Sequence, residues 1–169
     1  MRIALLFNTR PEGPTAGPGD TFEEFDTPDT VAAVARALAE FGEVEPVEAG
    51  RQLPRRLSES RFDFAFNIAE GFGRRCREAH AAALCELLGI PYTHSDPLTL
   101  ALTLDKMMAR RAVSPELAVA PAVLLADGEP PPVDFPYPAV VKPNDEGSSK
   151  GIRDDSVAGD ARQASALVS

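Results

Sequence analysis

The sequence predicts an α/β fold in which a parallel sheet comes first and a smaller α+β unit follows. Up to about residue 95, short apolar segments alternate with helical patterns in the order β-α-β-α-β-α-β. That order favours parallel strands joined by right-handed crossovers. The 16 prolines gather toward the second half, so we expect the architecture to change near residue 114. The chain has 169 residues and is 44% hydrophobic, which is enough to build a buried core.

The N-terminal segment predicts a buried strand followed by a helix. Residues 3–7 are nearly all apolar, as in strands that are covered on both faces. After a glycine- and proline-rich loop at residues 11–20, Thr27 can cap a helix and Pro28 suits its first position. Gly42 is expected to end this helix. Its apolar stripe has helical spacing and consists of Val31, Val34, Ala35, Leu38 and Phe41.

The following elements complete the predicted sheet. Strands are expected at residues 43–47, 62–68 and 90–93, with helices at 52–60 and 77–88. In the last of these helices we expect the apolar side chains to face inward, namely Ala79, Ala83, Leu84, Leu87 and Leu88. Ligands bind beyond the carboxyl ends of strands in such sheets. Asn8 and the residues from Asn67 to Gly71 lie at the carboxyl ends of two of the predicted strands and therefore mark a candidate binding edge.

The second unit has a different pattern. Ser95 or Asp96 can cap a helix at residues 97–104, and a further helix is expected to end near Val113. Residues 119–125 and 137–142 are predicted to form an antiparallel pair of strands around a proline-rich turn. A final helix is expected at residues 157–168, and the chain stops there without a returning strand.

Charge and composition exclude several classes of function. The net charge of −9 disfavours general nucleic-acid binding, which needs a basic surface. The sequence contains neither a run of about 18 apolar residues nor a signal peptide, so we expect a cytoplasmic protein without a membrane span. Cys76 and Cys85 are then free thiols. Cys76 and His80 are four residues apart, but two ligands are too few, and no metal site is predicted.

The loop after Lys142 is a candidate phosphate site. Gly147 and Gly151 permit unusual backbone conformations, and consecutive N–H groups in such a loop can surround an anion. Ser148 and Ser149 add hydroxyl donors, while Lys142 adds a positive charge. An ordinary hairpin loop would have a similar composition, and composition by itself leaves both interpretations open.

Two further groups of residues are candidates. Lys106 follows an apolar helical segment and is either a nucleotide contact or a solvated helix lysine. Charges surround Gly71 and Gly73, where the backbone could approach a ligand. Arginines there could bind carboxylate or phosphate, or the segment could be a solvated helix start. The charged residues are Glu70, Arg74, Arg75, Arg77 and Glu78.

Five motifs in order resemble the D-alanine–D-alanine ligase group of the ATP-grasp superfamily. They are Phe66–Gly71 (FNIAEG), the run from Arg77-Glu78 to Leu88–Thr93 (LGIPYT), Ser95–Leu100 (SDPLTL), Leu104–Lys106 (LDK) and Val141–Ser149 (VKPNDEGSS). The resemblance implies a Rossmann-like pre-ATP-grasp domain over residues 1–95, linker helices over 96–114, and the start of an ATP-grasp domain over 115–169. It also implies an ATP-dependent ligase that makes a peptidoglycan precursor.

The resemblance assigns nucleotide contacts to the second unit. Lys106 and Lys142 are expected to contact ATP. The loop of Gly147, Ser148 and Ser149 is expected to close over the phosphates and the acyl-phosphate intermediate, which makes the two serines the catalytic candidates. Glu146 lies beside this loop. Mg²⁺ would neutralise the transferring phosphoryl group, although no metal ligand is expected in this chain.

The resemblance also implies partners for the first unit. A small amino acid, D-alanine or a related one, is the expected substrate, with Glu70, Arg77 and Glu78 as its binding residues. A homodimer through the N-terminal domain is implied as well. His94 stands where the family usually has glycine. It could crowd the substrate pocket, or it could be a tolerated loop substitution.

The family's adenine hinge, catalytic arginine and metal ligands fall in a later segment than any present here. We therefore expect the 169 residues to be a truncated part that is inactive in ligation on its own. The alternative is a non-catalytic remnant that binds a small ligand or a partner. A flavodoxin-like protein would account for the first 95 residues but not for the second unit.

Overall fold

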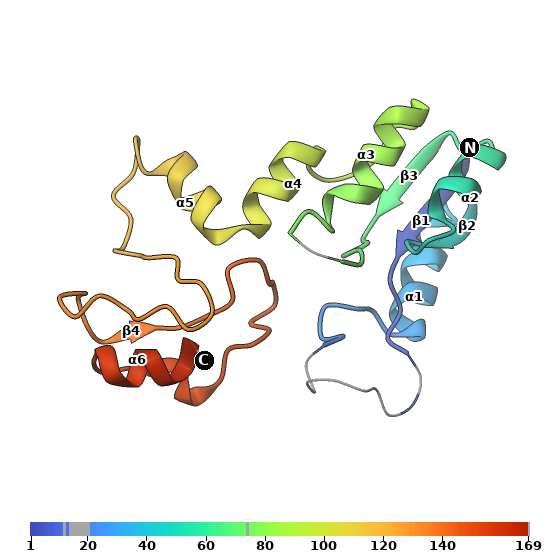
Figure 1. The fold of residues 1–169 in the computed structure, drawn as a ribbon. Helices are drawn as coiled ribbons and strands as arrows, with labels where there is room; N and C mark the ends of the chain where they lie inside the picture. The colour runs from blue at the N-terminus through green and yellow to red at the C-terminus, as the bar shows by residue number, and fades with distance from the viewer. Residues whose placement is uncertain (12, 14–20, 74, 169) are drawn as a thin grey trace. The chain divides into compact units, whose positions relative to one another are not determined.

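The computed structural model describes residues 1–11, 13, 21–73 and 75–168. Arg74 and most of the predicted loop at residues 11–20 lie outside the described residues. The chain forms two compact units, Met1–Leu102 and Thr103–Ser169 (Figure 1). In the part of the chain that is described, every helix is too short or too polar to cross a membrane.

A parallel three-stranded sheet forms the centre of the first unit. Its strands are β1 (Arg2–Phe7), β2 (Glu43–Glu48) and β3 (Phe64–Asn67), in the order β2-β1-β3. Both pairings with β1 are parallel, which confirms the predicted α/β fold class. The strand expected at residues 90–93 is reduced to one parallel bridge, between Ala65 and Tyr92.

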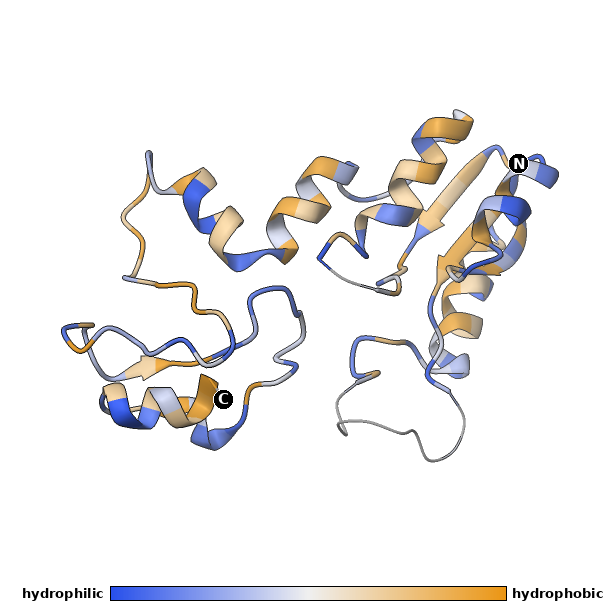
Figure 2. Ribbon diagram, viewed as in Figure 1, coloured by the Kyte–Doolittle hydropathy of each residue, from blue (hydrophilic) through white to orange (hydrophobic). Residues whose placement is uncertain are grey.

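Helices cover the sheet. α1 (Pro28–Leu38) packs on β1 and β2, α2 (Leu53–Glu59) on β2, and α3 (Ala79–Leu88) on β3 and α2. Side chains alternate between the two faces of a strand. Ala4 and Leu6 of β1 accordingly join the main hydrophobic core with residues of α2 and α3. Figure 2 shows β1 and β3 mostly in the colours of apolar residues, and the middle of β1 is buried as expected for a strand covered on both faces, whereas β2 contains three glutamates.

The start of α1 agrees with the sequence, but its end does not. The Thr27 side chain accepts a hydrogen bond from the Thr30 amide at 3.1 Å and caps the helix as predicted. The helix ends at Leu38, before Gly42, and Phe41 is exposed. A Cβ at Gly42 would lie 2.1 Å from the carbonyl oxygen of Met1. Gly42 therefore allows the chain to approach β1 closely instead of ending the helix.

The inward face of α3 differs from the predicted face. Leu87 is 81% exposed, and Leu88 and Ala83 are also exposed. The buried side chains are small and consist of Ala79, Ala81, Ala82 and Cys85. Small side chains allow α3 to approach α2 and the sheet closely. The prediction is therefore confirmed for Ala79, which is buried, and for Leu84, which packs against the core, but it is wrong for Ala83, Leu87 and Leu88.

In the C-terminal part, one helix begins where it was predicted, and the next ends at Val113 as predicted. Asp96 accepts hydrogen bonds from the amides of Leu98 and Thr99 at 2.9 and 3.0 Å, and so caps α4 (Pro97–Leu104). Asp105 accepts from the Met108 amide at 2.9 Å and caps α5 (Lys106–Val113). Such caps satisfy amide groups that the first turn leaves without a helical partner.

The predicted hairpin of the second unit is wrong. β4 (Ala139–Val140) pairs with β5 (Val157–Ala158), in antiparallel fashion. A 3-10 turn, η1 (Asp154–Ser156), precedes β5, and α6 (Ala161–Val168) follows it. Residues 118–126 have no regular structure. Proline at position 121 lacks the N–H group that a strand partner needs, which disfavours pairing in this segment.

Gly71 offers a direct test of the chain path at the sheet edge. It has φ of +75°, and a Cβ there would lie 2.2 Å from the carbonyl oxygen of Arg77. We expect Gly71→Ala to lower the free energy of unfolding by more than about 2 kcal/mol in urea denaturation. Gly73→Ala is the matched control, since Gly73 also has positive φ but open space around it. Gly73→Ala should lower the free energy of unfolding by about 1 kcal/mol. Equal losses in both variants would contradict the close approach of the chain at Gly71.

Candidate functional site

Two buried asparagines organise the carboxyl edge of the sheet. Asn8, directly after β1, donates to the Ala49 carbonyl at 3.1 Å and accepts from the Gly71 amide at 2.7 Å. Asn67, the last residue of β3, accepts from the Ala69 amide at 3.1 Å. Both side chains are buried. Together they fix the segment that carries Glu70.

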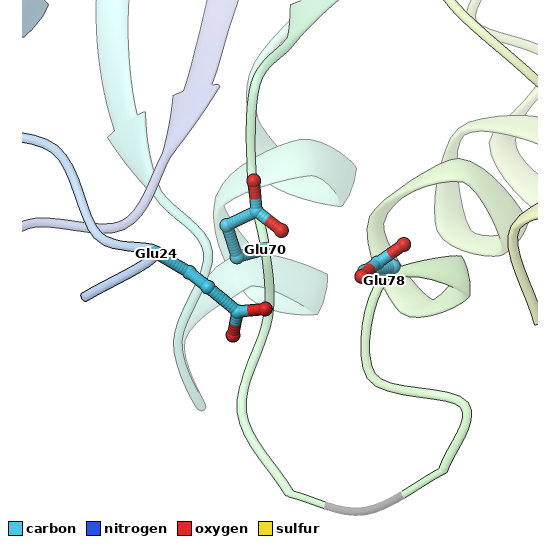
Figure 3. A group of neighbouring side chains, drawn as sticks. All are labelled: Glu24, Glu70 and Glu78. Atoms are coloured by element: carbon cyan, nitrogen blue, oxygen red, sulfur yellow. The ribbon is translucent and has the colours of Figure 1, made fainter. Parts of the chain in front are cut away.

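An acidic cleft of about 430 Å³ opens at this edge. Four carboxylates line it, namely Glu24, Asp26, Glu70 and Glu78. Oxygen atoms of three of them, Glu24, Glu70 and Glu78, lie within 4.8 Å of one another. Figure 3 shows these three side chains coming from three separate segments of the chain. This concentration of negative charge favours a cationic group in the cleft.

Arg77 forms an ion pair with one carboxylate of the cleft but is not itself among the residues that line it. Its Nη2 atom lies 3.0 and 2.9 Å from the two carboxylate oxygens of Glu24. The Arg77 and Glu24 side chains are only 5% and 3% exposed. Arg77 is thus paired with Glu24 and is not among the residues that line the cleft, and its role in substrate binding stays a prediction. Its guanidinium is positioned to offset the cost of burying the Glu24 charge.

The acidic environment changes the protonation of Glu70. Burial raises the pKa of Glu70 to about 7, and the nearby carboxylates of Glu78 and Glu24 act in the same direction. The guanidinium of Arg77 opposes this rise in pKa. Glu70 therefore changes charge near neutral pH. A cationic ligand in the cleft would favour its ionised form.

His94 lies at the edge of the same cleft. It has φ of +74°, a conformation uncommon outside glycine, and it lines the cleft with Asn67 and Leu100. Its ring packs edge-on against Phe66 at 5.9 Å between ring centres. The side chain therefore does occupy part of the pocket wall.

In the second unit, the predicted loop is folded against the start of α5. The Lys106 ammonium donates to the carbonyl oxygen of Glu146. The Lys106 amide donates to the Asn144 carbonyl at 2.9 Å. Two candidates that lie 40 residues apart, Lys106 and Glu146, are thus brought into contact.

The loop itself has the strained backbone expected of an anion-binding turn. Ser148 and Ser149 have φ of +46° and +60°, and Gly151 follows with +72°. The Lys150 amide donates to the Gly147 carbonyl at 2.8 Å, which closes the turn. Successive backbone N–H groups in a turn can point to one side and form a concavity that suits an anion. Both serines are exposed, so their hydroxyls are accessible to a ligand.

Two other charged side chains complete this region. The Lys150 ammonium lies 2.6 Å from the carboxylate of Glu146, which ties the two ends of the turn together. Lys142 lies two residues after β4 and is exposed. Its ammonium is therefore accessible to a ligand.

The predicted residues thus fall into two groups. Glu70 and Glu78 line the cleft of the first unit, whereas Lys106 and the residues of the loop lie in the second. The sequence did not point to Glu24 or Asp26. Their only signal was acidity just before a helix cap, and such acidity is common on protein surfaces. Their location in the cleft depends on how the chain returns to the sheet.

The chain is similar in sequence to curated D-alanine–D-alanine ligases. One from Geobacter sulfurreducens is 39% identical over 125 residues, which is 71% of this chain and 39% of the relative. One from Ruegeria is 42% identical over 123 residues, or 70% of this chain and 39% of the relative. The chain thus spans about two fifths of the length of these relatives. No family model matches it.

Solved structures support the fold. A D-alanine–D-alanine ligase from Bacillus anthracis has a TM-score of 0.71 and 21% identity, and the match covers 99% of this chain and 52% of that one. A second structure of the enzyme from Bacillus anthracis, complexed with ATP, has a TM-score of 0.70 and 19% identity, with 99% and 53% covered. By sequence and by fold, then, the chain is a homologue of the D-alanine–D-alanine ligases and corresponds to the N-terminal part of them.

Proposed function

We propose that the chain supplies the N-terminal part of an ATP-dependent carboxylate–amine ligase. In this reaction ATP phosphorylates a carboxylate, and an amine then displaces phosphate from the acyl phosphate. The observation that carries the proposal is the contact between Lys106 and the loop at Glu146, since it brings a cation to the turn that would bind phosphate. The names of the sequence relatives support the same reaction class.

The second unit is the proposed nucleotide side. Lys106 and Lys142 supply positive charge, while the amides of Gly147 to Ser149 and the two serine hydroxyls donate hydrogen bonds to phosphate oxygens. An ammonium at about 4 Å from a phosphate oxygen contributes about 4 kcal/mol at an effective dielectric of 20, before desolvation. Donors that are fixed before the reaction stabilise the charge that develops on the transferring group.

The first unit is the proposed amino-acid side. The carboxylates of Glu70 and Glu78 attract the ammonium group of a small amino acid, with D-alanine as the first candidate. Glu24 adds to the negative field and is held in place by Arg77. The imidazole of His94 is part of the cleft lining and takes up space there, which favours a substrate with a small side chain.

Magnesium fits this chain less well than the nucleotide does. Among the described residues, one group of three potential metal ligands lies close together, and this is Glu24, Glu70 and Glu78 in the first unit. Glu24 already has a cationic partner there in Arg77. The nucleotide loop lies in the other unit. We therefore assign no metal ligand in this chain and derive no step through Mg²⁺.

Three expectations remain proposals. They are a homodimer through the first unit, a cytoplasmic location and the inability of the 169 residues to complete ligation. The alternative function, ligand binding without catalysis, would use the same acidic cleft. If the 169 residues released phosphate from ATP only in the presence of D-alanine, the result would favour the ligase over the binding module and would contradict the third proposal.

The nucleotide proposal predicts a loss of ATP affinity in two variants. Lys106→Ala and Lys142→Ala should each weaken ATP binding by tenfold or more in isothermal titration, because each removes a charge-assisted contact. Arg36→Ala is a suitable control, since Arg36 is an exposed cation of α1 in the other unit. Wild-type affinity in both lysine variants would contradict the proposal.

The amino-acid proposal predicts a pH dependence. Because the pKa of Glu70 is about 7, its carboxylate is mostly ionised at pH 8 and mostly neutral at pH 6. D-Alanine affinity, measured by calorimetry, should therefore fall roughly tenfold between these values. Glu70→Gln should bind weakly at both pH values and lose the dependence. Glu116→Gln, an exposed carboxylate after α5, should behave like the wild type.

The same pKa predicts how stability varies with pH. The folded state binds a proton at Glu70 at a higher pH than the unfolded state, whose pKa is near 4.5. Through this group, the free energy of unfolding should rise as the pH falls from about 7 toward 4.5. In urea denaturation, Glu70→Gln should show a smaller change over this range than the wild type. Identical pH profiles would show that burial does not raise the pKa.

A further inference from the structure

Asn144 holds the start of α5 from a distant point in the sequence. Its carbonyl oxygen accepts from the Lys106 amide at 2.9 Å, and its side-chain Oδ1 accepts from the Met107 amide at 3.0 Å. The Asp105 carboxylate accepts from the third amide, that of Met108, at 2.9 Å. The first three amides of the helix therefore have partners, and two of those partners belong to Asn144.

This arrangement differs from an ordinary helix cap. At α1 the cap is Thr27, which directly precedes the helix and would act in an isolated segment as well. At α5 the local cap, Asp105, accounts for one amide. Asn144 lies 37 residues after Met107 and belongs to the loop side of the contact. Its hydrogen bonds therefore fix the helix and the loop relative to each other.

These hydrogen bonds also affect the position of Lys106. The backbone of this residue is tied to Asn144, and its ammonium donates to Glu146, two residues further along. A lysine side chain has four rotatable bonds, so its ammonium is directed only if the backbone below it is fixed. Without the Asn144 side chain, the Met107 amide would lose this acceptor, and of the two Asn144 hydrogen bonds only the main-chain bond to the Lys106 amide would remain.

We propose that Asn144 is a positioning residue for nucleotide binding, which acts by docking the N-terminus of α5 on the phosphate loop and so directing the Lys106 ammonium over it. This inference rests on the proposed function, because it names the residue that arranges the nucleotide side. Asn144 itself need not touch ATP. The two amide bonds to α5 use its carbonyl and its side-chain oxygen.

A double-mutant cycle tests whether Asn144 acts through Lys106. Asn144→Leu keeps a similar size but removes the side-chain acceptor, and should weaken ATP binding to the 169-residue chain roughly tenfold. In a Lys106→Ala background the same substitution should change affinity less than about twofold. Equal losses in both backgrounds would overturn the proposal, because they would show that Asn144 acts independently of Lys106.

A spectroscopic readout separates positioning from general stability. The NMR signal of the Lys106 side chain, recorded well below the unfolding transition, should shift in Asn144→Leu. Amide exchange at Met107 should also accelerate. Asn144→Asp retains an oxygen acceptor and should restore both signals. An unchanged Lys106 signal in Asn144→Leu would refute positioning, even if the variant were less stable.

A control variant at the C-terminal end of α5 tests whether a general loosening of the helix is enough to lower ATP affinity. Ser114 lies at the C-cap, and its hydroxyl donates to the Arg111 carbonyl at 3.3 Å. Ser114→Ala should leave ATP affinity within twofold of the wild type, and a loss like that of Asn144→Leu would count against the proposal. If the wild-type chain fails to bind ATP, the proposed function fails. The Lys106 signal then still decides whether Asn144 positions Lys106.

Discussion

The buried amide of Asn8 is the interaction on which the first unit depends. Parallel strands end at one edge of the sheet and leave backbone groups there that the ladder does not satisfy. Asn8 uses its donor for the carbonyl of Ala49, after β2, and its acceptor for the amide of Gly71, after β3. One side chain thus ties together the segments that leave three strands. Glu70 immediately precedes Gly71, so the position of its carboxylate depends on this link.

Electrostatics explain how an acidic cleft can exist at that edge. Burial raises the pKa of Glu70, and repulsion by the neighbouring carboxylates of Glu78 and Glu24 adds to the rise. Arg77 reduces the repulsion by pairing with Glu24 in the wall. The cleft remains acidic at its surface and suits an ammonium group. The loop of the second unit carries lysines and left-handed residues instead. The proposed ligase function depends on this difference in charge between the two sites.

The second unit shows how a short helix and a loop can be organised with little regular structure around them. β4 and β5 contain two residues each, so the sheet by itself holds the chain only weakly. Hydrogen bonds between Asn144 and the start of α5 add a fixed point at the beginning of the loop. The Glu146–Lys150 ion pair adds another at its end. Preorganisation of the turn at Gly147 to Ser149 depends on these contacts.

The sequence by itself determined the features that depend on neighbouring residues and on repeated patterns. The apolar run of β1, the Thr27 cap and the Asp96 cap each act within a few residues, and all three appear where they were predicted. The order of strands and helices was enough for a parallel sheet. The five motifs were enough to predict the family, because both the motifs and their order can be read from the sequence without the structure.

Only the tertiary structure decided which distant groups meet. The buried face of α3 depends on how closely small residues approach the sheet, and the partner of β4 depends on a segment that lies after the loop. The same holds for the Glu24–Arg77 pair and for Asn144 at α5, whose partners are 53 and 37 residues away. Side-chain partners at such separations leave no periodic trace in the sequence, since the chain path between them, and not local propensity, brings them together.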